Sequence, residues 1–268
     1  MKYAFILCVS PRGNRYLRIY NNGSLTNCSG DSYTQTGFNR SGIQPSPSNP
    51  LGNPPYPGWT ASNGPNWVGY LTTKYNASLL QTFNLADGGA TVDASLVAPW
   101  KPTVLSLQDQ VWSGFFPYYA LGRPAWTSAD TLFAVWIGIN DVGNSYYNGP
   151  AVTSVLNADI IAEYRGAVDG LYAAGGRNFV FLNVPPVERS PLILGQGQQA
   201  IDMEKADLAA FNGLVEEMAG AFKSENGDAN VWIYDTNVVF GEVLDDPASY
   251  PQTAVYKNTT GFCEAYQK

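Results

Sequence analysis

The stretch TLFAVWIGIND, residues 131–141, decides the fold. Its first part, Thr131–Ile137, is a short apolar run rich in β-branched and aromatic side chains, which is typical of a strand buried on both faces. Gly138 and the pair Asn140-Asp141 then end the run. A carboxamide at a strand end can donate a hydrogen bond to a developing oxyanion, and glycine leaves space beside it. The same residues also suit an Asx turn that simply ends the strand.

Similar apolar runs occur before and after this stretch, and helical patterns lie between them. The other predicted buried strands are Leu79–Ala86, Asn178–Val184 and Asn230–Tyr234. Within residues 200–222 one apolar stripe recurs at helical spacing: Ile201, Leu208, Phe211, Val215, Met218 and Phe222. A second helix is predicted over Val155–Ala174. It ends at Gly175-Gly176, where glycine suits the left-handed C-cap position.

Strands that alternate with helices of this length predict an α/β fold, with a parallel sheet and helices on both faces. Ligands of such sheets bind at the carboxyl ends of the strands. Polar motifs directly after strands are therefore the candidate site residues.

Two further motifs have this character. Gly30-Asp31-Ser32 would place a serine hydroxyl at a turn, although a chance tripeptide in a loop is the plainer interpretation. Asp87-Gly88-Gly89 follows the strand at 79–86, and its glycines would let a reacting group approach the backbone N–H groups closely. An ordinary turn after a strand would look the same.

Composition excludes several classes of partner. The chain has 15 Lys and Arg against 22 Asp and Glu, a net charge of −7, so nothing here would neutralise the phosphates of a nucleic acid. No apolar stretch reaches the length of a membrane-spanning helix. The aromatic content of 13% is explained by core packing or by a cleft that stacks sugar rings.

The N-terminal end differs from the rest of the chain. Residues 1–9 resemble the start of a signal peptide but are followed by Pro11 and Arg12, without a cleavage pattern. We therefore expect residues 1–29 to be an atypical segment and residues 30–268 to form the domain. Secretion is expected from this start and from the Asn-x-Ser/Thr sequons, which lie at Asn22, Asn27, Asn39, Asn76 and Asn258.

Taken together and in this order, the three motifs resemble the conserved blocks of the GDSL, or SGNH, hydrolase superfamily. Residues 136–141 (WIGIND) and 181–186 (FLNVPP) are similar to the fungal-type acetylesterases of carbohydrate esterase family 16. The resemblance runs from about Gly30 to Lys268. It implies a three-layer α/β/α sandwich, flavodoxin-like, around a central parallel sheet, and an ester hydrolase that needs no metal or organic cofactor.

The resemblance also implies residue roles. Ser32 would be the nucleophile, and its own N–H, the N–H of Gly89 and the side chain of Asn140 would form the oxyanion hole. Asp31 and Asp141 are expected to hold their turns by hydrogen bonds rather than to act as acids.

Both ends of the chain depart from the family pattern. The family's Asp-x-x-His block is missing, and the 268 residues contain no histidine, so we expect them to be nearly inactive on their own. On the other side, the residues before Gly30 are mostly polar where the family has an apolar strand. These departures lead to the hypothesis of a truncated or mis-spliced product. A substitute base could be sought at Lys74, Lys101, Asp87 or Asp93, but their spacing singles out none of them.

The leading interpretation is a secreted, monomeric esterase that removes acetyl groups from plant-derived oligosaccharides. Its substrate would be an acetylated oligosaccharide or another small ester. One alternative is a catalytically dead relative that binds glycans. The other is a lipase or short-chain esterase of the same superfamily.

Overall fold

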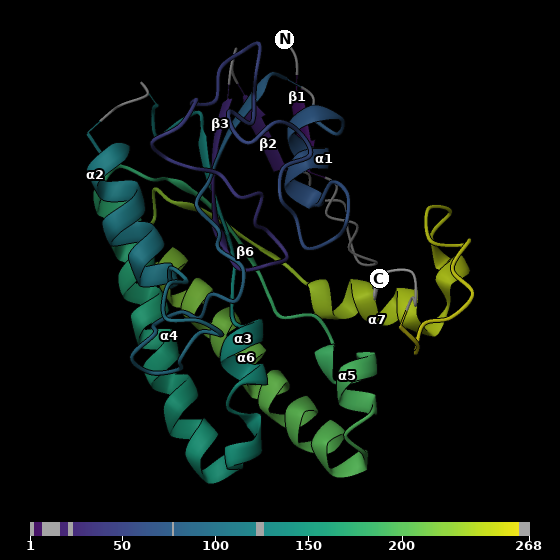
Figure 1. Cartoon of the computed structure of the whole chain (residues 1–268). Helices are drawn as coiled ribbons and strands as arrows, with labels where there is room; N and C mark the ends of the chain where they lie inside the picture. The colour runs from purple at the N-terminus through teal and green to yellow at the C-terminus, as the bar shows by residue number, and fades with distance from the viewer. Residues whose placement is uncertain (1–2, 7–16, 21–23, 77, 122–125, 263–268) are drawn as a thin grey trace.

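The computed structural model describes residues 3–6, 17–20, 24–76, 78–121 and 126–262. Its core is a sheet of five strands in the order β4-β3-β5-β6-β7, in which every neighbouring pair is parallel. Figure 1 labels β3 and β6 of this sheet. The strands are β3 (Ser24–Gly30), β4 (Leu80–Asn84), β5 (Thr131–Trp136), β6 (Asn178–Leu182) and β7 (Asn230–Tyr234). A separate antiparallel pair consists of β1 (Tyr3–Ile6) and β2 (Leu17–Tyr20).

Helices connect the strands. The α-helices are α1 (Trp67–Thr73), α2 (Phe116–Tyr118), α3 (Ile139–Gly143), α4 (Pro150–Ala173), α5 (Pro191–Leu194), α6 (Gln198–Glu225) and α7 (Thr236–Asp245). The shorter turns are a π-helix, η1 (Asp109–Phe115), and the 3₁₀ helices η2 (Tyr146–Asn148), η3 (Val187–Arg189) and η4 (Pro247–Ser249). Within the described ranges no helix is long and apolar enough to cross a membrane.

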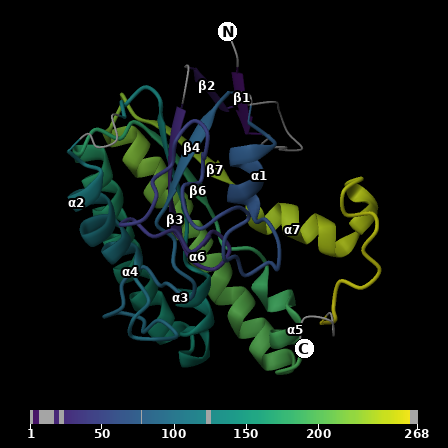
Figure 2. The same cartoon turned by 45° about the horizontal axis from the view of Figure 1, so that its top comes forward.

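Alternate side chains of β5 pack into two different cores, as expected for a strand buried on both faces. Phe133 and Val135 belong to the larger apolar cluster, which includes side chains of α4 and α6. Leu132, Ala134 and Trp136 belong to the smaller one, which includes α1. Helices thus cover both faces of the sheet, α4 and α6 on one and α1 on the other (Figure 2). The predicted α/β/α sandwich is confirmed.

The two predicted helices are confirmed with small shifts at their ends. The apolar stripe over residues 200–222 lies within α6, and the helix predicted over 155–174 is α4, which begins earlier, at Pro150. As predicted, α4 ends at glycine. Gly175 has φ of 110° and its N–H donates to Tyr172 O at 2.9 Å, while Gly176 N–H donates to Leu171 O at 2.9 Å. These two bonds form a Schellman motif, which satisfies the last carbonyls of the helix.

Strand β3 corrects the expectation for the N-terminal segment. The boundary expected after residue 29 falls inside this strand, which pairs with both β4 and β5. Leu25 and Cys28 enter the two apolar cores, whereas Thr26, Asn27 and Ser29 are buried polar residues. Burial also raises the pKa of the Cys28 thiol. Pairing on both edges supplies the backbone hydrogen bonds that hold this polar strand in place. Residues 7–16 and 21–23 of the expected segment lie outside the described residues.

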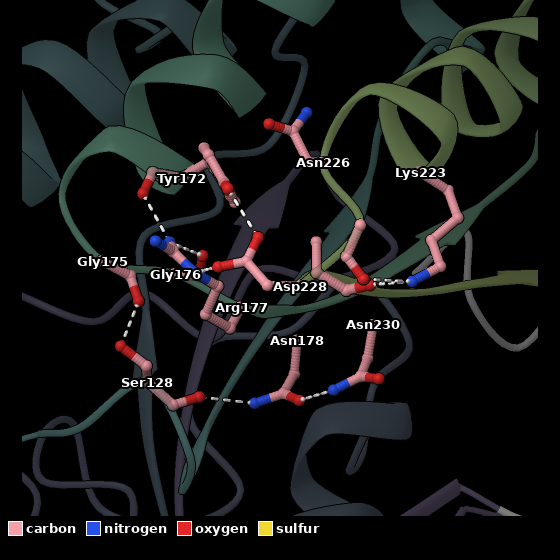
Figure 3. A network of polar contacts seen from close by, with 12 residues as sticks. Ser128, Tyr172, Gly175, Gly176, Arg177, Asn178, Lys223, Asn226, Asp228 and Asn230 are labelled. Carbon is pink, nitrogen blue, oxygen red and sulfur yellow. Dashed lines mark hydrogen bonds and ion pairs between the residues drawn. The ribbon is translucent and has the colours of Figure 1, made fainter.

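A polar network ties the sheet to α4 and α6 at the amino ends of β6 and β7 (Figure 3). Arg177 Nε donates to Asp228 at 2.8 Å, and the Tyr172 hydroxyl donates to the other oxygen of the same carboxylate at 2.6 Å. Asn178 Nδ2 donates to Ser128 O at 2.8 Å. These contacts fix the edge of the sheet opposite to the carboxyl ends, where the predicted site residues follow the strands.

Candidate active site

The three predicted site residues follow three strands that lie side by side. Ser32 comes after β3, Gly89 after β4 and Asn140 after β5, and β3 pairs with both of the others in parallel. The carboxyl ends of parallel strands meet at one edge of the sheet, so the fold brings the three motifs to the same edge.

Hydrogen bonds join the three motifs directly. Asp87 N–H, in the loop after β4, donates to Gly30 O at the end of β3, at 3.1 Å. Asn140 Nδ2, at the start of α3, donates to Ala90 O at 2.8 Å. Ala90 follows Gly89, so the carboxamide lies against the loop that carries the expected second N–H donor.

The turn that carries Ser32 is held by its neighbour Asp31. The Asp31 carbonyl accepts from Thr34 N–H at 3.0 Å and from Gln35 N–H at 2.9 Å. The Asp31 carboxylate accepts from Tyr33 N–H at 2.9 Å. Asp31 therefore holds the turn by hydrogen bonds to the residues that follow the serine, as expected for it, and Ser32 itself remains partly exposed.

Glycine is required at the residue that enters this turn. Gly30 has φ of 152°, and a Cβ at this position would lie 2.1 Å from the backbone oxygen of Trp136 in β5. Any side chain would push β3 and β5 apart where the two strands end. The glycine thus allows the serine turn to pack against the strand that leads to Asn140.

Asp141 has a matching role beside Asn140. Both oxygens of its carboxylate lie within hydrogen-bonding distance of Val92 N–H, at 3.0 and 3.2 Å, so Asp141 holds the far side of the Gly89 loop. Burial raises the pKa of Asp141 to about 7. Burial, together with the nearby charge of Asp141, raises the pKa of Asp31 to about 7 as well, although the Tyr33 N–H bond opposes this shift. Each carboxyl group therefore keeps its proton to a much higher pH than an exposed aspartate does.

Gln110 also belongs to this site, and nothing in its sequence context indicated it. It comes from the π-helix η1, is fully buried, and its Oε1 accepts from Gly30 N–H at 2.8 Å. Its Nε2 donates to Gly30 O at 2.8 Å and to Leu105 O at 2.9 Å. The side chain thus holds both backbone groups of the glycine that enters the serine turn. The feature that marks Gln110 is the π-helix, which is seen in the structure and not in the sequence; such bulges often occur at functional sites.

Aromatic rings lie beside Ser32 on the α1 side of the sheet. The ring of Tyr33 lies 5.1 Å from that of Trp136 and 6.4 Å from that of Phe240 in α7. Trp67 of α1 packs 6.3 Å from Trp136, and its indole N–H donates to Thr34 Oγ1. These rings form an apolar wall next to the serine turn.

The four candidate substitute bases all have other partners. Asp87 accepts from Leu105 N–H, and Asp93 accepts from Ser95 N–H. Lys101 lies over the ring of Trp100, and Lys74 lies over Tyr70 and Tyr75. The structure therefore favours none of them as a base for Ser32. In the part of the chain that is described, no group of three or more His, Cys, Asp or Glu side chains could hold a metal ion.

Comparison with known proteins gives consistent matches. The model of the GDSL-like lipase/acylhydrolase family matches residues 28–267. An acetylesterase from Thermothelomyces thermophilus is 44% identical over 244 residues, which is 87% of this chain and 78% of that protein. An acetylesterase from Hypocrea jecorina is 32% identical over 165 residues, 58% of this chain and 46% of that protein. Among solved structures, a mutant of an acetyl-xylooligosaccharide esterase from Geobacillus aligns over 90% of both chains with a TM-score of 0.51 at 17% identity, which shows a shared fold.

Proposed function

The chain belongs to the GDSL-like lipase/acylhydrolase family of serine esterases, and we propose that within this family it is a carbohydrate acetylesterase with Ser32 as its nucleophile. The 44% identical relative is named an acetylesterase, which supports an acetyl ester as the substrate. The Geobacillus protein of the same fold is named for acetylated xylo-oligosaccharides, which supports a sugar as the alcohol part.

The observation that carries this proposal is the convergence of three turns at one sheet edge. Ser32 Oγ would attack the ester carbonyl and lose its proton to a base. The carbonyl oxygen would become an oxyanion, bound by the N–H groups of Ser32 and Gly89 and by Asn140 Nδ2. Collapse would release the sugar hydroxyl and leave acetyl-Ser32. Water would then hydrolyse that ester to acetate and free serine.

The base is the part of this mechanism that these residues do not supply. A polypeptide of the 268 residues contains no histidine, so Ser32 has no imidazole to take its proton. Loss of the histidine in a serine hydrolase lowers turnover by up to about a million-fold. The oxyanion donors alone still give a rate about a thousandfold higher than that of the uncatalysed reaction in water. We therefore propose that this polypeptide alone is nearly inactive.

We also propose that the protein is secreted and glycosylated. Sequons at Asn39 and Asn258 have asparagines that are at least partly exposed, so both sites are open to modification. Asn27, in contrast, is buried in β3 and should stay unmodified. Expression in a secreting eukaryotic host, followed by glycopeptide mapping, tests this pattern.

Imidazole in the buffer tests the proposed esterase, because it can replace the missing base. Hydrolysis of p-nitrophenyl acetate and p-nitrophenyl palmitate is measured with and without imidazole for the wild type and for Ser32→Ala, whose rate also corrects for imidazole acting alone. We expect Ser32-dependent hydrolysis that requires imidazole and favours acetate. Preference for palmitate would favour a lipase instead. Equal rates for wild type and Ser32→Ala would overturn the proposal and favour a glycan-binding relative.

A further inference from the structure

Trp100 is a large exposed side chain in contact with the oxyanion loop. The residue is 63% exposed. Its indole N–H donates to Gly88 O at 3.1 Å. A Cβ placed on Gly89 would lie 2.0 Å from Cδ1 of the same ring, so the indole rests directly on the residue expected to donate to the oxyanion. Gly89 also has φ of 86°, and both facts require glycine there.

The loop that carries Trp100 is tied back to the segment after β4 at several points. The Asp87 carboxylate accepts from Leu105 N–H at 2.9 Å. Thr91 Oγ1 donates to Val97 O at 2.8 Å, and Leu107 N–H donates to Thr91 O at 2.9 Å. The indole is therefore held in place before any ligand arrives, which reduces the entropy that binding would cost.

Two other exposed tryptophans, Trp59 and Trp112, pack against glycines outside the oxyanion loop, Trp59 against Gly37. Trp112 stacks on Phe116 with ring centroids 4.7 Å apart and lies against Gly170 of α4. Trp100 instead contacts the oxyanion loop through the edge formed by Cδ1 and Nε1. Over its ring lies the Lys101 ammonium, 3.8 Å from the centroid. A fixed indole that leaves most of its surface in water has little value for the core, whereas it is suited to binding a flat, partly apolar ligand.

We propose that Trp100 is the platform on which the sugar ring of the substrate stacks while the acetyl carbonyl lies at Gly89. This inference rests on the proposed function, because it assigns the alcohol part of the same ester. The C–H face of a pyranose would pack on the indole face that Lys101 does not cover. The same cation disfavours a positively charged sugar, so the platform selects a neutral or acidic one.

Binding of acetylated xylo-oligosaccharides tests the platform without needing turnover, because the polypeptide is expected to be nearly inactive. Isothermal titration calorimetry would compare the wild type with Trp100→Ala, Trp100→Phe and the control Trp112→Ala, which removes another exposed indole over α4. Circular dichroism and a thermal melt would show that each variant is folded. Titration of the Trp100 indole N–H signal by NMR would locate the ligand on the wild type.

We expect Trp100→Ala to weaken binding about tenfold or more, Trp100→Phe to lose less, and Trp112→Ala to bind like the wild type. Equal affinity of folded Trp100→Ala and wild type would overturn the platform and leave the esterase proposal standing. The platform would also be overturned if no glycan binds while Ser32-dependent acetate hydrolysis persists. Loss of binding in Trp100→Ala without any Ser32-dependent hydrolysis would support the platform and contradict the nucleophile.

Discussion

Asn140 Nδ2 donates a hydrogen bond to the Ala90 carbonyl oxygen at 2.8 Å. This bond crosses from the start of α3 to the loop after β4, so it fixes two expected oxyanion donors, the Asn140 carboxamide and the Gly89 N–H, relative to each other. Asp141 reinforces the arrangement through Val92 N–H. The carboxamide carries a second N–H, which leaves a donor for the substrate while the first holds the loop.

Replacing Asn140 should therefore affect catalysis more than stability. Asn140→Ala removes one oxyanion donor, and we expect imidazole-assisted, Ser32-dependent hydrolysis of p-nitrophenyl acetate to fall about 100- to 1,000-fold in kcat. Stability should fall by only about 1 kcal/mol, for one lost hydrogen bond. A loss of less than about threefold in kcat, in a variant that melts normally, would exclude Asn140 from the oxyanion hole.

Gln110 should matter for stability because its partners are buried backbone groups. Gln110→Leu would remove three buried hydrogen bonds, to the N–H and C=O of Gly30 and to the C=O of Leu105. We therefore expect the free energy of unfolding to drop by about 3 kcal/mol. Urea denaturation measures this change. Gln108→Leu is the matched control. The Gln108 side chain makes only exposed contacts, to Glu163 and Trp112, so this substitution should cost less than about 1 kcal/mol. Similar losses in both variants would contradict a special role for Gln110.

Replacing Thr26 should increase the stability of the protein, in contrast to replacing Gln110. Its hydroxyl is buried in β3, a strand with a partner on each side, and has no hydrogen-bond partner among the described residues. Thr26→Val keeps the β-branched shape and removes the unsatisfied oxygen, so we expect a gain of about 1 kcal/mol in the free energy of unfolding. Destabilisation in urea would show that the hydroxyl is satisfied in solution.

Buried acids should make the protein less stable as the pH rises. Burial, together with the charges of Glu188 and Asp207, raises the pKa of Glu204 to about 7, and Asp31 and Asp141 are raised to about 7 as well. In the unfolded chain these carboxyl groups titrate at about pH 4. The folded state therefore binds more protons than the unfolded state between these values, so stability is greatest at low pH and is lost as the pH rises through about 7.

The slope is at most about 1.4 kcal/mol per pH unit for each group. Melting curves from about pH 4.5 to about pH 8 should show the decline, and Glu204→Gln should make it shallower, because the amide does not titrate while Asp31 and Asp141 still do. Flat melting temperatures over this range in the wild type would contradict these shifts.

The sequence predicted the strands that are apolar on both faces and could not predict β3. In β5 and β6 the apolar run itself marks the strand, because both faces pack against helices. In β3 the polar residues Thr26, Asn27 and Ser29 hide the strand, which is held by pairing with β4 and β5. This non-local pairing is invisible in a local pattern.

Local sequence patterns also reveal only part of the candidate active site. Ser32, Gly89 and Asn140 stand directly after strands, so position and residue type indicated them. Gln110 lies in a π-helix and Trp100 in a loop, and neither belongs to a periodic pattern. Their contacts are long-range: Gln110 binds a glycine 80 positions earlier in the chain. Only the folded structure relates such residues to Ser32.

Covalent labelling tests most directly whether Ser32 is the nucleophile. The protein would be incubated with a fluorophosphonate in the presence of imidazole, digested, and mapped by mass spectrometry. A single adduct on the peptide that contains Ser32, absent from Ser32→Ala, is the predicted result. Labelling of another residue, or equal labelling of wild type and Ser32→Ala, would contradict the account.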